Sequence, residues 1–235
     1  MIDHLENEDP EFASPACLMH EVDPAYMGLG SECRDIGAWR RVERRRLMEM
    51  RALTPLAERE ERTRALCRRL DDVLPPDLRK TISLFWPMRG EPDLRTWMSS
   101  LRDRGATCLL PVVIQKNCPL VFRPWQQGDL LERGFFNIPV PVRGEEHLPE
   151  IVIAPVIGFD SGCYRLGFGG GYFDRTLAAF SSRPLVIGIG YEFQRIGSIH
   201  PQAHDIPMDL IVTDQSSMVR EEPRSLLSGH HKCEA

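Results

Sequence analysis

The sequence lacks the cysteine pattern of a disulfide-stabilised or zinc-binding protein. Its seven cysteines are scattered over 235 residues, their number is odd, and no two of them form a Cys-x-x-Cys pair. Disulfide frameworks and structural zinc sites depend on such paired spacings. The absence excludes a small disulfide-rich domain and favours a reducing compartment, so we expect a cytoplasmic protein.

Long apolar runs and a secretory signal are missing as well. No window approaches the ~18 apolar residues of a membrane span. The N-terminal "MIDHLENEDPEF" has neither the basic start nor the apolar segment of a signal peptide. We therefore expect no membrane partner. With 42% hydrophobic and 27% charged residues, the chain has the composition and length of one globular domain with extensions, expected to be a monomer.

Lysine is scarce, with three lysines against 26 arginines. Arginine suits bidentate recognition of phosphate and carboxylate, although a high arginine content can also reflect genome composition. The charge is uneven, because residues 1–36 carry nine acidic groups and one arginine, which gives about −8. Since the whole chain carries −5, the remainder is only about +3. That charge is too small for a nucleic-acid surface, and we expect no nucleic-acid partner.

Residues 37–215 alternate between helical and strand-like segments. The pattern predicts helices near residues 39–53, 54–74, 93–105 and 172–180, and strands near 81–88, 106–113, 119–125, 151–160, 184–191 and 210–214. Alternation of this kind predicts an α/β fold, a three-layer α/β/α sandwich with a largely parallel central sheet.

Three details of this fold are expected from local patterns. An apolar stripe should bury the first helix through Val42, Leu47, Met50 and Leu53. Residues 1–36 should form an irregular acidic leader outside the domain. Residues 216–235 show no pattern and should form a C-terminal tail.

The segment "RLGFGGGYFDR", residues 165–175, holds four glycines within five positions between a buried strand and a helix. Glycine allows positive φ and close approach of backbone N–H groups, and a helix N-terminus attracts anions. Together these features predict a phosphate cradle, with fixed charge from Arg165 and Arg175 and with Asp174 placed to hold Mg²⁺. Neither the Walker A nor the Rossmann motif fits, because Tyr172 and Phe173 follow the glycines. A tight turn without a ligand remains the alternative.

Three further clusters carry chemistry. Arg40 and Arg44 lie four residues apart on one helix face, which Arg51 continues, although such a face can also be merely solvated. "FWPMRGEPD" places Trp86 near Glu91 after a strand; the alternative is a core tryptophan followed by a turn. In "HPQAHDIPMD", two prolines argue against a His-x-x-x-His metal site. They leave Asp205 as a candidate Mg²⁺ carboxylate.

In this order, the clusters resemble the 5-formyltetrahydrofolate cyclo-ligase family over about residues 40–214. The motifs that carry the resemblance are "GFDSGCYRLGFGGGYFDRTL", "WPMRGEPD" and "AHDIPMDLIVTD". The resemblance implies a cytosolic enzyme with a single α/β domain. It would use ATP and Mg²⁺ to convert 5-formyltetrahydrofolate into 5,10-methenyltetrahydrofolate, ADP and phosphate. A paralogue that activates another small formamide or carboxamide, and a non-catalytic folate- or nucleotide-binding protein, are the alternatives.

The resemblance also implies roles for individual residues. The ATP-binding residues would be Arg40, Arg41, Arg44, Arg165, Leu166, Gly167, Phe168, Gly169, Gly170, Gly171, Tyr172 and Phe173. The folate-binding residues would be Arg44, Trp86, Glu91, Phe168, Gly169, Gly170, Gly171 and Tyr172. The catalytic residues would be Arg165, Tyr172 and Asp174, and the Mg²⁺ ligands would be Asp174 and Asp205.

The chain departs from the family pattern in two places. Some members have a lysine where Gly170 stands, so any role of that lysine would fall here to Arg165, Arg175 or backbone N–H groups. The first basic position, Arg40, is a lysine in the usual motif, and arginine is not a compact point charge. The register of this motif is open by one residue, because alignment on "RAL" at 51–53 would place Trp39 and Glu43 there instead.

Overall fold

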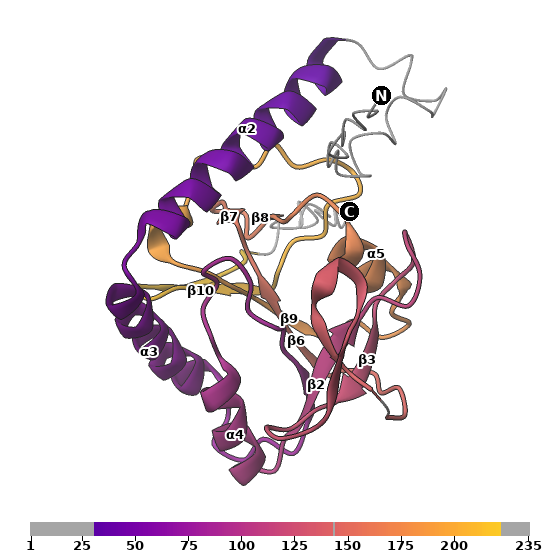
Figure 1. The fold of residues 1–235 in the computed structure, drawn as a ribbon. Coiled ribbons are helices and arrows are strands. Elements are labelled where there is room, and N and C mark those ends of the chain that lie inside the picture. The colour runs from indigo at the N-terminus through magenta and orange to yellow at the C-terminus, as the bar shows by residue number, and fades with distance from the viewer. Residues whose placement is uncertain (1–30, 143, 222–235) are drawn as a thin grey trace, which may run out of the picture.

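The computed structural model describes residues 31–142 and 144–221 (Figure 1). Most of the predicted leader (residues 1–30) and of the predicted tail (residues 222–235) therefore lies outside the described residues. In the described part of the chain, no helix is long and apolar enough to span a membrane.

A seven-stranded sheet forms the centre of the molecule, with the strand order β11-β10-β9-β6-β1-β2-β3. Its strands are β1 (Thr81–Ser83), β2 (Thr107–Val112), β3 (Val121–Pro124), β6 (Ile151–Pro155), β9 (Leu185–Ile189), β10 (Leu210–Val212) and β11 (Ser217–Val219). The five central strands are parallel, and only the edge strands β3 and β11 run antiparallel to their neighbours. The predicted α/β fold with a largely parallel sheet is confirmed.

Alternating side chains of the strands fill two separate cores. In β6, Ile151 and Ile153 face one core, and Val152 and Ala154 face the other. The first core is covered by α3 (Leu56–Val73) and α4 (Arg95–Asp103), and the second by α5 (Tyr172–Ala179) (Figure 1). Parallel strands are buried on both faces, which explains their continuous apolar sequences.

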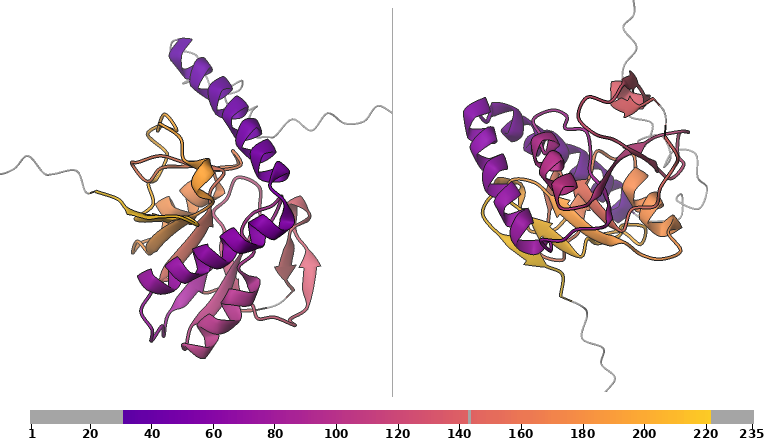
Figure 2. Two further views of the ribbon diagram at one scale, coloured as in Figure 1. Left: turned by 90° about the vertical axis from the view of Figure 1, so that its left-hand side faces the viewer. Right: turned by 90° about the horizontal axis from the view of Figure 1, so that it is seen from below.

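Helix α2 (Ser31–Leu53) lies across one end of this sandwich and extends beyond its body (Figures 1 and 2). It begins six residues before the boundary expected at residue 37, so the leader is not irregular throughout. The predicted apolar stripe is wrong except for Leu47, which is fully buried; the side chains of Val42 and Leu53 are 63% and 82% exposed. The helix buries arginines in their place.

Three further segments differ from the expected strands and tail. The expected tail from residue 216 contains β11, which pairs antiparallel with β10 and so adds an edge strand. The expected strand at 151–160 is divided into β6 and β7 (Gly158–Phe159), and β7 forms a hairpin with β8 (Arg165–Leu166). A second hairpin, β4 (Leu131–Arg133) with β5 (Pro139–Pro141), lies in the proline-rich connection.

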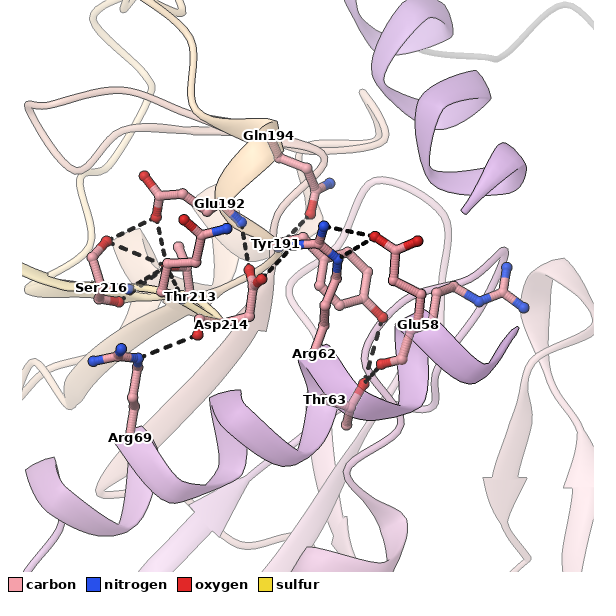
Figure 3. A network of polar contacts seen from close by, with 12 residues as sticks. Glu58, Arg62, Thr63, Arg69, Tyr191, Glu192, Gln194, Thr213, Asp214 and Ser216 are labelled. Atoms are coloured by element: carbon pink, nitrogen blue, oxygen red, sulfur yellow. Dashed lines mark hydrogen bonds and ion pairs between the residues drawn. The ribbon is translucent and has the colours of Figure 1, made fainter. Parts of the chain in front are cut away.

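A polar network fixes α3 to the edge of the sheet (Figure 3). Arg62 of α3 pairs with Glu58 on its own helix and with Asp214 beyond β10, at 2.7 and 2.6 Å. The Tyr191 hydroxyl lies 3.5 Å from that of Thr63 on the same helix. The network places α3, and with it the end of α2, at a fixed position relative to the carboxyl ends of the strands.

Candidate active site

The glycine loop joins β8 to the N-terminus of α5 at the carboxyl edge of the sheet. Gly169 and Gly171 have φ of +96° and +61°, values that side chains resist, and Gly171 is the residue that caps α5. Among the described residues, no hydrogen bond to a protein acceptor uses the N–H groups of residues 167–171. The backbone N–H groups of these residues, at the N-terminus of α5, are therefore without an acceptor in the described part of the chain, as a phosphate-binding loop requires.

Arginine side chains surround this loop with donors that lack acceptors. Arg165 is buried, and its Nε and Nη2 have no hydrogen-bond partner. Its Nη2 lies 3.1 Å from Asp174 Oδ2, which is ion-pair distance without hydrogen-bond alignment. Arg175 folds back over the Tyr172 ring and donates to the carbonyl of Gly170, while its Nε is also unpaired. Buried guanidinium donors without acceptors favour an anionic ligand at this place.

The arginine face of α2 meets the same region, as the spacing predicts. Arg44 donates from Nε to the Gly167 carbonyl at 2.7 Å, and its guanidinium lies beside Gly169. Arg40 is buried and donates to the carbonyls of Ile199 and His200 at 3.0 and 2.8 Å. Arg41, by contrast, is exposed and lies near Gly37 of its own helix.

The residues of the two possible registers of the basic motif make different contacts. Trp39 packs edge-on against the ring of His200, and Glu43 pairs with Arg46 on its own helix. Arg44, in contrast, contacts the glycine loop directly.

The two candidate metal carboxylates lie on neighbouring segments, and each one faces an arginine. Asp174 accepts from the N–H of Ile206, the residue next to Asp205, at 3.3 Å, and pairs with Arg165. Asp205 accepts from Arg40 through both oxygens, at 2.5 and 3.3 Å, and from the Gln202 N–H at 2.7 Å. In the described part of the chain, no three His, Cys, Asp or Glu residues gather as a metal site.

These contacts decide how the residues fit Mg²⁺, which prefers oxygen ligands and keeps several positions for water or phosphate. Asp174 fits, because its pairing with Arg165 is loose. Asp205 fits only after Arg40 has moved. Burial by itself would raise the pKa of the Asp205 carboxyl, but the hydrogen bonds from Arg40 and the Gln202 N–H outweigh it and hold that pKa below its ordinary value.

The turn after β1 carries the candidate folate residues. Glu91 is buried and accepts from the Met88 N–H at 2.9 Å. Trp86 is half-buried, with its ring edge-on to Trp125 and the Arg95 guanidinium over its face. Since β1 and β6 are adjacent parallel strands, this turn and the glycine loop lie at the same edge of the sheet.

Glu91 is the most perturbed acid of the site. Burial raises the pKa of its carboxyl to about 7, although the nearby Arg51 guanidinium and the Met88 N–H oppose that rise. Arg51 of α2 is fully buried, with Nη1 3.8 Å from Glu91 Oε1. Helix α2 therefore reaches the glycine loop with Arg44 and the Glu91 turn with Arg51.

Phe136, to which no sequence pattern assigned a role, also borders the glycine loop. Phe136 sits between β4 and β5 with φ +57°, a strained value for phenylalanine, and is 62% exposed. Its ring lies edge-on to Tyr172, with the centroids 5.9 Å apart. An exposed aromatic side chain held against the glycine loop offers a flat ligand a second surface beside Tyr172. The signal in the sequence was the paired phenylalanines of "FFNIPVP".

Curated enzymes of one family are similar in sequence to this chain. The 5-formyltetrahydrofolate cyclo-ligase of Escherichia coli K12 is 28% identical over 173 residues, which cover 69% of this chain and 93% of that protein. The cyclo-ligase of Mycolicibacterium smegmatis is 27% identical over 148 residues, which cover 60% of this chain and 76% of that protein.

Solved structures and a family model give the same result. The solution structure of 5,10-methenyltetrahydrofolate synthetase from Aquifex aeolicus superposes with a TM-score of 0.70 at 29% identity, covering 83% of this chain and 99% of that one. The model of the 5-formyltetrahydrofolate cyclo-ligase family matches residues 36–214. The chain belongs to the 5-formyltetrahydrofolate cyclo-ligase family.

Proposed function

We propose that the protein uses ATP and Mg²⁺ to convert 5-formyltetrahydrofolate into 5,10-methenyltetrahydrofolate, ADP and phosphate. The observation that carries the proposal is the set of unpaired donors around the glycine loop. Free N–H groups of residues 167–171 meet unpaired guanidinium nitrogens of Arg165 and Arg175 at the N-terminus of α5. Donors of both kinds match the oxygens of a polyphosphate. Family membership supports the choice of reaction.

The ion pairs of the site suggest how the charges are kept balanced. Two of the arginines assigned to ATP face carboxylates assigned to the metal: Arg40 pairs with Asp205, and Arg165 pairs with Asp174. We infer that both arginines turn to the phosphates when the nucleotide binds, which releases both carboxylates for Mg²⁺. When bound, that ion neutralises phosphate charge and orients the γ-phosphate. This exchange is the condition under which Asp205 becomes a ligand.

The chemistry follows from the substrate. The N5-formyl group is an amide whose oxygen cannot leave as oxide. In the proposed reaction this oxygen attacks the γ-phosphorus, ADP leaves, and the carbon carries a phosphate ester. N10 then adds to that carbon, loses its proton, and the C–O bond breaks to release phosphate and leave the methenyl bridge. Phosphoryl transfer needs mainly positioning and charge neutralisation, which Arg165, Arg175 and the loop N–H groups can supply.

The folate half of the site is assigned to the neighbouring turn. A pterin carries adjacent N–H donors on one edge, and a carboxylate with two acceptor oxygens complements them. Glu91 is the buried carboxylate available for this role, and Trp86, Tyr172 and Phe136 offer flat faces to the rings.

The decisive experiment incubates the protein with ATP, Mg²⁺ and 5-formyltetrahydrofolate and follows the ultraviolet absorbance of the methenyl product. Product formation that requires both ATP and Mg²⁺ is the expected result. ADP release with a different formamide or carboxamide, but not with this folate, would support a paralogue. Tight binding of ATP and folate without turnover would support a non-catalytic binding protein.

A further inference from the structure

Arg51 is a buried arginine whose guanidinium is only partly used. Its side chain is 0% exposed, and its Nε donates to the Arg89 carbonyl at 2.9 Å. Its Nη1 and Nη2 have no hydrogen-bond partner. Arginine keeps its proton in proteins, so a full positive charge is held inside, with one contact to the backbone of the Glu91 turn. Burying a charge costs free energy unless it is paired, so the group opposite the guanidinium matters.

The charge faces Glu91. Its two carboxylate oxygens differ: Oε2 accepts from the Met88 N–H, whereas Oε1 has no hydrogen-bond partner and lies 3.8 Å from Arg51 Nη1. The guanidinium is too far from Oε1 to occupy it with a hydrogen bond. It is near enough to stabilise the negative charge in a medium of low dielectric. Oε1 therefore accepts no hydrogen bond among the described residues, and the charge of Arg51 favours its ionised form.

We propose that Arg51 is the positioning residue for the folate-binding carboxylate: its charge favours the ionised form of Glu91 and leaves Oε1 free to accept from the pterin edge. The inference rests on the proposed function and adds a residue of α2 that does not itself touch substrate. Glu91 is almost fully buried and the turn at residues 86–88 is half-buried, so the proposal requires this turn to move when the pterin binds. The backbone contact from Arg51 to Arg89 steadies the remainder of that turn.

A second charge near the pair, that of Arg89, also affects the ionisation of Glu91. The charge of Arg89 also favours the ionised carboxyl, while burial disfavours it and leaves the pKa of Glu91 near 7. Arg59 and Tyr191 face Arg51 from α3 and from the end of β9. Among the described groups around the pair, Glu91 is the one that titrates near neutrality. Without the charge of Arg51, burial would act on Glu91 less opposed, and its pKa would rise.

The kinetic test compares Arg51→Met, Arg51→Lys and, as a matched control, Arg45→Met, which removes an exposed arginine of the same helix. Arg51→Met should raise the KM for 5-formyltetrahydrofolate at pH 7 by roughly fivefold or more, because the ionised fraction of Glu91 falls. The KM for ATP and kcat should change much less. Arg51→Lys should restore most of the folate KM, and Arg45→Met should match the parent protein. Equal losses in the KM for ATP and for folate would overturn the proposal.

A second measurement needs no turnover and separates this inference from the proposed function. Carbon-13 NMR of protein labelled at glutamate Cδ follows the Glu91 carboxyl, whose signal is identified by its loss in Glu91→Gln. We expect its titration midpoint near pH 7 in the parent protein. In folded Arg51→Met it should lie about one pH unit or more higher. An unchanged midpoint would refute the role of Arg51 even in an active enzyme, while the expected shift in an inactive protein would leave only the cyclo-ligase assignment refuted.

Discussion

Arg40 and Arg51 lie on the same face of α2, and each is paired with a carboxylate from a distant part of the chain. Arg40 grips Asp205 through both oxygens, the shorter contact being 2.5 Å, whereas Arg51 stays 3.8 Å from Glu91. Burial opposes ionisation of both acids. It is outweighed at Asp205, whose pKa is lowered, and wins at Glu91, whose pKa rises to about 7.

At Asp205 the hydrogen bonds from Arg40 and the Gln202 N–H outweigh burial, whereas at Glu91 the charge of Arg51 opposes burial only in part. The Arg40–Asp205 pair is a closed contact that holds α2 to the segment before β10. The Arg51–Glu91 pair is open and keeps an acceptor unoccupied. The Arg40–Asp205 pair is suited to exchange partners only when a stronger anion binds. The Arg51–Glu91 pair is suited to respond to pH and to a neutral ligand.

The largest effect is expected on the nucleotide side of the comparison. Asp174→Asn should lower the activity by on the order of 100-fold or more, because it removes the carboxylate that best fits Mg²⁺ beside the cradle. Asp77→Asn, at an exposed ion pair with Arg79, is the matched control and should be neutral. Full turnover by Asp174→Asn, measured over a range of Mg²⁺ concentrations, would refute the metal assignment.

The closed pair should matter most for stability. Arg40→Met leaves Asp205 buried with one remaining hydrogen-bond donor, the Gln202 N–H, and we expect a loss of about 3 kcal/mol in the free energy of unfolding. Chemical denaturation of the single variants and of the Arg40→Met/Asp205→Asn double variant measures the coupling. If the two single losses simply add up in the double variant, the pair contributes nothing specific.

The open pair should make stability depend on pH in an unusual direction. The Glu91 carboxyl binds its proton more tightly in the folded protein than in the unfolded chain, where its pKa is near the ordinary 4.5. Between about pH 4.5 and 7 the free energy of unfolding should therefore fall as pH rises, by up to about 1.4 kcal/mol per pH unit.

Glu91→Gln removes this titration, so its stability curve should be flatter over that range. Folate binding should respond in the opposite sense, improving as pH rises through 7, since the ionised carboxylate is the acceptor. A Glu91→Gln protein with the same pH dependence of unfolding as its parent would show that Glu91 is an ordinary carboxyl.

The smallest effect, on ligand affinity, is expected from substituting Arg44 and its neighbour Arg45 one at a time. Arg44→Ala should weaken ATP and folate binding by about tenfold, because it removes the contact with the Gly167 carbonyl and a charge beside Gly169. Arg45 points about 100° away on the helix and is exposed, so Arg45→Ala should be neutral. Calorimetry of both variants gives the comparison, and equal affinities would assign α2 a solvated basic face only.

The sequence predicted the sheet well and the packing of α2 poorly. Continuous apolar runs such as "IVIAPVIGFD" require burial on both faces, so the parallel strands could be recognised. The stripe from Val42 to Leu53 failed because arginine is normally assigned to the surface. Here Arg40 and Arg51 find buried acceptors only through partners more than 30 residues away, which no local pattern records.

The site shows the same division between local and distant information. The glycine loop and its place at the start of α5 followed from "GFGGGYFD" alone, because glycine and helix termini act locally. The pairing of Arg165 with Asp174 and the contact of Phe136 with Tyr172 did not. Strand β11 was missed because Ser217–Val219 is too short to show a period of two.

Helix α2 also determines how the two substrates can influence each other. Arg44 and Arg51 are seven residues apart, so a rise of about 10 Å along one helix separates the contact with the glycine loop from the contact with the Glu91 turn. In the proposed site, a displacement of α2 on binding of ATP at the glycine loop would be transmitted along the helix to the Glu91 turn. Thermodynamic linkage then requires that folate change the affinity for ATP by the same factor.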